Sequence, residues 1–421
     1  MKITIHRGTH QIGGCITEIN HEDYRLFIDL GEPLPGTPNT ESIPIEGLTQ
    51  GDTTRSALFI THYHEDHIGR ILEAQHEVPI YMGKTALKIY KCTKNYLFNI
   101  LQPDGKEKLE RILKRMENVH TFTPGKDMSI GPFRIIPLMV DHSAFDAYMF
   151  VIEAGGTRLL YTGDFRGHGF RSKALPKLMA VYAKEIDYII SEGTNIYRTV
   201  EIESEQTLQR RFIEEFRQSK YNFVLTASTN IDRIFSLYHA AYQAGRIFVC
   251  DNYQKKLMDI VASNHGFYTS FYQIREQVYV PKRYKDGNYF FPERLLNLMK
   301  SKGFCMPIRN NRHFWNFVST FDGDQDQTLY YSMWEGYLDE SSPTTLNADM
   351  KEALSHYPGY KSMHTSGHCD IQTLEKLFWQ VKPRKGIIPI HTEHPERFET
   401  LFGSIAPIIL IQDGETYIAT T

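Results

Sequence analysis

The stretch that decides the fold is Thr61-His62-Tyr63-His64-Glu65-Asp66-His67-Ile68-Gly69. It directly follows the apolar run 57–60, a predicted strand, and it leads into a predicted helix at about 69–75. Three histidines and an aspartate fall within six residues, and a strand-to-helix turn can point their side chains into one space. Neutral imidazoles with a carboxylate are typical zinc ligands, with manganese or iron as alternatives. The stretch therefore predicts a metal site.

Further candidate ligands stand where other predicted strands end. His142 follows the strand at 133–140, Asp164 follows the strand at 157–161, and His391 follows the strand at 386–390. The carboxyl ends of strands are where α/β folds gather their sites. Each residue alone is an ordinary loop residue, so the set as a whole carries the prediction.

Beyond these segments, the pattern of predicted helices and strands divides the 421 residues into three parts. The first, 1–195, has many short strands and one long helix at about 85–118. The second, 196–364, alternates helices at 204–219 and 231–243 with strands at 223–227 and 246–250, as in a helix-covered parallel sheet. The third part, 365–421, resembles the first in its short strands, with a helix at 374–380 and strands at 386–390, 408–412 and 416–419. We predict one α/β domain that is split by an inserted α/β domain.

Charge and cysteine content exclude several classes of protein. The 47 basic and 50 acidic residues give a net charge of −3, which excludes a globally basic nucleic-acid coat but allows a local basic groove. Five distant cysteines without a C-x-x-C pair, no signal peptide, and apolar runs too short to span a membrane predict a cytoplasmic protein. The helix at 85–118 also has a basic face. We interpret this face as exposed to solvent, with contact to phosphate as the alternative. The basic residues are Lys84, Lys88, Lys91, Lys94, Lys106, Lys108, Arg111, Lys114 and Arg115.

The 61–69 stretch resembles the H-x-H-x-D-H signature of the metallo-β-lactamase fold, and Asp29 resembles the aspartate of that fold's first motif, which orients the metal loop. The resemblance covers residues 1–195 and 365–421. It implies an αββα sandwich that holds two metal ions, expected to be Zn²⁺ with Mn²⁺ or Fe as alternatives. By the family pattern, the first ion has the ligands His62, His64 and His142, the second has Asp66, His67 and His391, and Asp164 bridges the two.

The remaining motifs resemble those of the β-CASP nucleases, and most closely the ribonuclease J family. Glu192 in Ser191-Glu192-Gly193-Thr194-Asn195 resembles motif A, His368 resembles motif B, and His391 resembles motif C. The stretches 64–69, 142–147 and 162–165 carry the likeness to ribonuclease J. The resemblance implies a hydroxide held between the two metal ions, with Asp66 as a catalytic residue that orients it, and a catalytic Glu192–His368 pair that serves the leaving oxygen.

Three segments are candidates for binding substrate. Ser228, Thr229 and Asn230 precede a helix predicted to begin near 231, where backbone N–H groups favour anions, and the family's phosphate-facing loop adds Arg233. A loop of mostly small residues suited to phosphate consists of His364, Thr365, Ser366 and Gly367. Bases alternate with aromatic rings in 279–291, which suits single strands, with a surface turn as the alternative; its residues are Tyr279, Lys282, Arg283, Tyr284, Lys285, Tyr289, Phe290 and Phe291.

Several positions depart from the family pattern. Asp232 replaces the usual histidine, and Thr392 replaces a glycine. Tyr63 replaces a small residue inside the metal loop and is expected to narrow the entrance to the metal site. Residues 330–337 replace a Ser-rich loop, and the sequence ends before the family's C-terminal domain.

We expect a zinc-dependent hydrolase that cleaves single-stranded RNA in exonuclease or endonuclease mode. The alternatives are a DNA nuclease of the β-CASP group and a hydrolase of a small ester or thioester, against which the large insertion argues. A metal-containing RNA-binding protein without turnover is a further alternative, against which the complete ligand set argues. No membrane partner is expected, and a homo-oligomer is left open.

Overall fold

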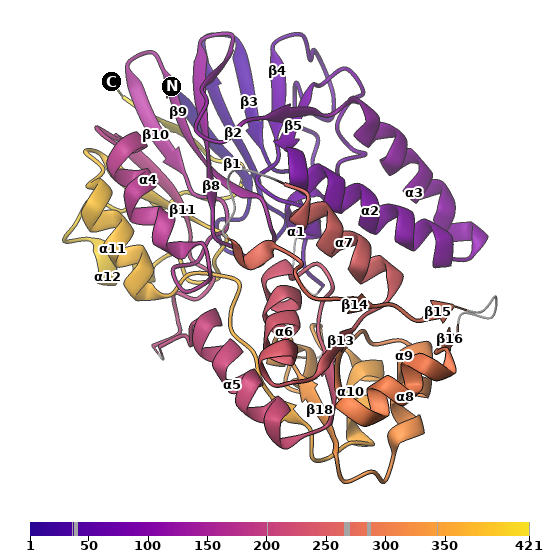
Figure 1. Ribbon diagram of the computed structural model, residues 1–421. Coiled ribbons are helices and arrows are strands. Elements are labelled where there is room, and N and C mark those ends of the chain that lie inside the picture. Colours follow the sequence, from indigo (N-terminus) through magenta and orange to yellow (C-terminus); the bar gives the residue numbers. More distant parts are fainter. Residues whose placement is uncertain are drawn as a thin grey trace. The chain divides into compact units, whose positions relative to one another are not determined.

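The computed structural model describes residues 1–35, 37, 41–199, 201–264, 270–283, 288–342 and 344–420. The chain forms two units: unit 1 is Met1–Glu201 with Gly367–Thr421, and unit 2 is Ile202–Ser366. Figure 1 shows their elements in sequence colours.

Unit 1 contains two sheets. The first has the order β21-β1-β2-β3-β4-β5-β6, with strands β1 (Lys2–Arg7), β2 (Ile16–His21), β3 (Tyr24–Ile28), β4 (Ser56–Phe59), β5 (Ile80–Gly83), β6 (His120–Phe122) and β21 (Thr416–Ile418). The second has the order β20-β11-β10-β9-β8-β7, with strands β7 (Met128–Ile130), β8 (Phe133–Val140), β9 (Ala147–Ala154), β10 (Thr157–Tyr161), β11 (Tyr188–Glu192) and β20 (Gly386–Ile390). Because β21 pairs with β1 and β20 pairs with β11, the C-terminal segment completes both sheets.

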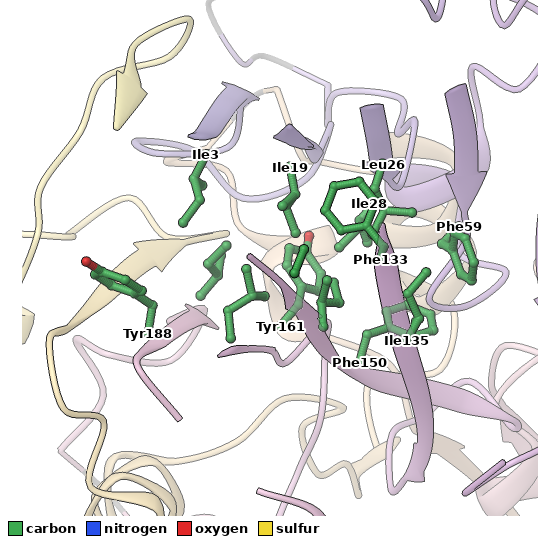
Figure 2. Close-up of a cluster of buried hydrophobic side chains, with 14 of the residues drawn as sticks. Ile3, Ile19, Leu26, Ile28, Phe59, Phe133, Ile135, Phe150, Tyr161 and Tyr188 are labelled. Atoms are coloured by element: carbon green, nitrogen blue, oxygen red, sulfur yellow. The ribbon is translucent and has the colours of Figure 1, made fainter. Parts of the chain in front are cut away.

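The main core of unit 1 lies between these two sheets. Ile3 and Ile19 of the first sheet and Ile135 and Phe150 of the second belong to one buried cluster, shown in Figure 2. Neighbours in sequence point the other way, as a strand period of two requires, so Ile136 belongs to a separate cluster on the far face of the second sheet.

Helices cover the outer sides of the two sheets. Buried side chains of α4 (Leu175–Tyr182), α11 (Ile371–Val381) and α12 (Arg397–Phe402) pack on the far face of the second sheet. On the side of the first sheet, α2 (Lys84–Ile100) contacts β5 and α3 (Pro103–Arg115) (Figure 1). Unit 1 also has the short helices α1 (Glu65–Ile68), η1 (Met116–Asn118) and η2 (Ser172–Ala174). The predicted α/β class and the αββα order of layers are confirmed.

Three predicted elements of unit 1 are wrong. The single helix at 85–118 is two helices, because Leu101 and Gln102 are extended before Pro103 and a proline disfavours helical backbone in the residue that precedes it. The helix at 69–75 is instead α1, which ends at Ile68. The strand at 408–412 is reduced to one bridge between Ile387 and Ile408.

Unit 2 is built on a parallel sheet with the order β14-β13-β17-β12-β18-β19. Its strands are β12 (Tyr221–Leu225), β13 (Ile247–Val249), β14 (Val278–Tyr279), β17 (Phe304–Ile308), β18 (Gln327–Tyr331) and β19 (Lys361–Ser362). Its helices are α5 (Glu205–Gln218), α6 (Ile231–Gln243), α7 (Asn252–Ala262), η3 (Ser270–Tyr272), α8 (Glu293–Lys302), α9 (Arg312–Val318), η4 (Ser319–Phe321), η5 (Glu335–Leu338) and α10 (Ala348–Ser355). A small ribbon pairs β15 (Lys282–Arg283) with β16 (Tyr289–Phe290). Across both units, no helix among the described residues is long and apolar enough to cross a membrane.

Candidate metal centre

The loop after β4 is held in place by Asp29, which follows β3. Asp29 is fully buried and has a left-handed backbone, with φ of 62°. Its carboxylate accepts hydrogen bonds from the Thr61 backbone N–H (2.8 Å), the Thr61 hydroxyl (2.9 Å) and His67 Nδ1 (2.7 Å). These bonds fix the start and the end of the 61–67 loop at one point, so Asp29 orients the loop from behind.

Three histidines form a first cluster. His62 Nε2 lies 3.1 Å from His64 Nδ1, and His142 Nε2 lies 3.3 Å from the same atom. Burial lowers the pKa of His62 and His142 well below the ordinary value and that of His64 to about 4. Three nitrogens that converge in this way repel one another when protonated, whereas neutral imidazoles bind a cation.

Two carboxylates and two histidines form a second cluster, and its four ligand atoms lie within 4.8 Å of one another. His67 Nε2 is 3.1 Å from Asp164 Oδ2, and His391 Nε2 is 3.3 Å from Asp66 Oδ2. Burial would lower the pKa of His67, but the carboxylates of Asp164, Asp29 and Asp66 outweigh burial and raise it. Burial would raise the pKa of Asp164, but His391 and His67 outweigh it and lower that pKa.

Asp164 lies between the two clusters. Its Oδ2 is 3.1 Å from His67 Nε2, 3.8 Å from His62 Nε2 and 4.0 Å from His142 Nε2. Both oxygens of Asp164 and Nε2 of His67 are buried, and despite the 3.1 Å approach none of them makes a hydrogen bond of suitable geometry with the described residues. Because buried polar atoms are normally satisfied, these atoms fit the ligand set of a cation between the clusters.

Four of the histidines are oriented through the other ring nitrogen, Nδ1. The acceptors are the Thr61 hydroxyl for His62, Asp29 for His67, the Gly367 carbonyl for His142 and the Thr194 hydroxyl for His391. Donation from Nδ1 leaves the lone pair of Nε2 directed to the centre, which is the usual arrangement of a metal-binding histidine. Sequence reasoning missed Thr194 and the Gly367 carbonyl in this role.

A buried ionic cluster shapes the loop that carries His142. The Asp141 carboxylate accepts from Arg166 Nε at 2.9 Å and from the Arg171 backbone N–H at 2.6 Å. The Arg171 guanidinium donates to the His142 carbonyl at 2.8 Å. Neither arginine has a motif that marks this role in the sequence, although both follow Asp164 within seven residues.

Glu192 and His368 form the pair that was expected from motifs A and B. Glu192 is fully buried; its Oε1 accepts from Phe165 N at 2.8 Å and its Oε2 lies 3.0 Å from His368 Nδ1. Burial would lower the pKa of His368, but Glu192 and Asp164 outweigh it and raise that pKa to about 9. His368 Nδ1 is 3.7 Å from Asp164 Oδ2, so the pair stands directly beside the second cluster.

Cys15 is a neighbour of the centre that the sequence analysis left as a plain thiol. Its sulfur lies within 4.8 Å of ligand atoms of His67 and His391. Burial and the nearby Asp164 carboxylate raise the pKa of the thiol, and metals bind the thiolate. We therefore leave Cys15 outside the proposed ligand set.

The expected phosphate loop of unit 2 is only partly accessible. Ser228 is buried and accepts hydrogen bonds from Gln254 and Arg309, while Asn230 caps α6 by accepting from Arg233 N. Thr229 and Asn230 are half-buried.

The structure contradicts the predicted phosphate contact of Arg233. It is fully buried, and its guanidinium donates to Glu205 at 3.1 Å, to the Ser332 hydroxyl and to the Met363 carbonyl. Arg233 therefore ties α5, α6 and the ends of two strands together and does not face a phosphate.

The loop of His364, Thr365, Ser366 and Gly367 falls on both sides of the unit boundary. In unit 2, Thr365 is buried and its hydroxyl donates to the Glu203 carbonyl, while His364 and Ser366 are half-buried. In unit 1, Gly367 supplies the carbonyl that holds His142.

Two other expectations from the sequence have different outcomes. Tyr63 is buried and its hydroxyl accepts from Phe145 N, so it braces the loop after His142 and does not narrow an entrance. In the basic and aromatic stretch 279–291, Tyr284 and Lys285 lie outside the described residues, and Phe291 is buried in the core of unit 2.

Comparisons with known proteins agree with this geometry. Residues 19–190 match the family described as metallo-beta-lactamase superfamily. Ribonuclease J of Helicobacter pylori (strain J99) is 25% identical over 449 residues, which cover 99% of this chain and 60% of that protein. Ribonuclease J of Mycoplasma genitalium is 24% identical over 416 residues, which cover 93% of this chain and 68% of that protein. The chain thus spans about 60% of the length of the first of these relatives.

A solved structure from Enterococcus faecalis V583, described as a protein of unknown function, shares the fold. It matches with a TM-score of 0.74 and 19% identity over 99% of both chains. This likeness extends the shared fold to both units.

Proposed function

We propose that this protein is a metal-dependent phosphodiester hydrolase that cleaves single-stranded RNA. The chain carries a metallo-β-lactamase domain and resembles ribonuclease J over most of its length. Two Zn²⁺ ions are the proposed cofactors, with Mn²⁺ or Fe as alternatives. The cysteine pattern of the sequence favours the cytoplasm as the place of action.

The position of Asp164 carries this proposal. One carboxylate oxygen lies within 4.0 Å of nitrogens from both clusters, and a carboxylate shared in this way supports two adjacent ions with His62, His64 and His142 on one side and Asp66, His67 and His391 on the other. Two adjacent ions, when bound, would activate water at neutral pH and polarise a phosphate oxygen.

The residues around the ions have separate tasks in this proposal. Asp66 has one oxygen beside His391, and its carboxylate can orient the attacking water. Glu192 holds the imidazole of His368 beside the centre through a 3.0 Å contact between Glu192 Oε2 and His368 Nδ1. We assign to His368 the phosphate contact and the proton for the leaving oxygen, and to Glu192 the orientation of the ring.

RNA is favoured over other substrates by the name of the relatives, ribonuclease J, and by the inserted α/β unit of 165 residues, Ile202–Ser366. Small esters do not need an insertion of this size. Within the proposal, Thr229, Asn230, His364 and Ser366 remain candidates for substrate contact.

The test compares matched RNA and DNA oligonucleotides of one sequence, with the metal-loaded protein. The His64→Ala and Asp164→Ala variants should keep their fold and lose cleavage, whereas the control His76→Ala, at an exposed histidine of the same unit, should cleave normally. Substrates with 5′-monophosphate, 5′-triphosphate and 5′-hydroxyl ends identify the mode: mononucleotides indicate an exonuclease and internal fragments an endonuclease. Preferential cleavage of DNA would favour the DNA-nuclease alternative, and no cleavage of either polymer would refute the proposal.

A further inference from the structure

Helix α2 carries a stripe of lysines that is not explained by the metal centre. Lys84, Lys88 and Lys91 are spaced at i, i+4 and i+7, which places them on one face of the helix. Lys84 and Lys88 are exposed and Lys91 is half-buried. Within the described part of the chain, the side chains of these three lysines form no ion pair and no hydrogen bond.

The composition of α2 argues against ordinary solvation. The helix Lys84–Ile100 has four lysines and no acidic residue, so like charges repel at i+3 and i+4 spacing and cost helix stability. The neighbouring α3 alternates signs instead, with Glu107 and Glu110 among its basic residues. In a chain with a net charge of −3, an unbalanced stripe of this kind indicates an anionic partner.

Both metal-bearing loops fix the position of this helix. Lys94, the fourth lysine of α2, is buried and donates to Glu65 at 2.6 Å, and Glu65 precedes the proposed ligand Asp66. The first turn of α2 donates to the Asp146 carboxylate through Thr85 N at 2.8 Å and Ala86 N at 2.9 Å. Asp146 lies in the loop after His142, so the helix that carries the stripe is held by the two loops that carry proposed ligands.

We propose that Lys84, Lys88 and Lys91 bind the phosphate backbone of single-stranded RNA where the strand extends beyond the metal centre. The three side chains span about 10 Å along the helix axis, a length that serves consecutive phosphates. The inference rests on the proposed ribonuclease function and adds a binding surface outside its centre.

The experiment measures the salt dependence of binding in the full chain, with Asp164→Ala in every protein to prevent cleavage. Fluorescence anisotropy with a labelled 30-nucleotide RNA gives the affinity at several KCl concentrations. The stripe variant replaces the three lysines with glutamine (K84Q/K88Q/K91Q). The matched control, K173Q/K177Q/K376Q, removes three exposed lysines near α4 and α11. Circular dichroism melting establishes that each variant is folded.

Each neutralised phosphate contact contributes about 0.7 to the slope of log affinity against log salt for single strands. The stripe variant should therefore lose about 2 units of slope, and at 50 mM salt it should bind more weakly than the control. Between 50 and 200 mM salt, its affinity should fall about 20-fold less than that of the control. The control should keep the slope of the protein with the lysines intact.

Equal slopes for the stripe and control variants would overturn the inference while leaving the proposed function intact. If the protein with Asp164 restored neither binds nor cleaves the 30-mer, the proposed function itself fails and the stripe proposal falls with it.

Discussion

Asp29→Asn tests whether the hydrogen bonds behind the metal loop set its affinity for metal. The change keeps the size of the side chain, and asparagine tolerates the left-handed backbone that Asp29 adopts at φ of 62°. It removes the negative charge and replaces one acceptor oxygen with an NH₂ group. The perturbation is therefore confined to hydrogen bonding and charge.

The structure gives the size of the expected effect. Asp29 receives three donors, from the Thr61 backbone, the Thr61 hydroxyl and His67 Nδ1. An amide that has one oxygen leaves at least one of these buried donors facing its NH₂ group, which costs about 1–3 kcal/mol of folding stability. Where the NH₂ group faces His67, the imidazole has to donate from Nε2, and its lone pair leaves the centre. Loss of such a support costs about 10–100-fold in metal affinity.

The assay is a competition titration of Zn²⁺ against a chelator, together with urea denaturation of the metal-free protein. Asp146→Asn is a matched control, because Asp146 is also buried, has φ of 67°, and accepts several hydrogen bonds from the start of α2 and from Tyr148. It should lose stability but keep its metal affinity. The reasoning is refuted if Asp29→Asn binds Zn²⁺ as tightly as the parent protein, or if the control loses as much affinity.

Three further outcomes are expected. Glu192→Gln should lower kcat about 10–100-fold with unchanged metal content, because it weakens the support of the His368 ring; elemental analysis together with kinetics checks this, and equal loss of metal would contradict it. Arg233→Ala should lower the free energy of unfolding in urea by about 3–5 kcal/mol, since it removes the guanidinium that pairs with the buried Glu205 carboxylate, whereas replacing both residues with apolar ones should recover most of the loss; a weaker affinity for RNA without loss of stability would restore the phosphate role. Removal of metal with EDTA should lower Tm, because an ion present at 100 times its Kd stabilises the native state by about 2.7 kcal/mol; an unchanged Tm would argue against metal binding by the folded state.

Most strands of unit 1 can be predicted because they are short runs of β-branched and aromatic residues bounded by Gly, Asp or Asn. In β8 and β9 alternate residues enter two separate cores, so both faces are apolar and each strand is a nearly continuous apolar run. The stretch 85–118 is predicted as one long helix, but Pro103 disfavours helical backbone at Gln102, and the chain is extended at Leu101 and Gln102 between the two helices. Helix α1 is a single turn, Glu65–Ile68, and its N-cap His64 makes no side-chain capping hydrogen bond, so its start has no capping signal in the sequence.

Burial explains the error at Arg233. A short motif preserves residue type, and arginine serves equally well against a phosphate or in an ion pair. The distinction depends on Glu205, Ser332 and Met363, which lie 28, 99 and 130 residues away in the sequence. No local pattern connects positions at such separations, so the role of Arg233 becomes visible only once the elements of unit 2 are packed.

The same reasoning gives Gly367 a different role from the one its loop suggested. Its carbonyl accepts from His142 Nδ1 at 2.7 Å, and an added Cβ would lie 2.5 Å from Ser143 Oγ. Glycine at this position lets the backbone approach His142 closely enough for that bond. The backbone that holds a ligand of the first cluster continues directly into His368, whose ring stands beside the second cluster. The segment 367–368 thus supports the proposed ligand His142 through Gly367 and carries the proposed phosphate-contacting residue His368. A backbone carbonyl has no signature of its own in a sequence, so side chains suggest candidate ligands whereas this support can be seen only in the structure.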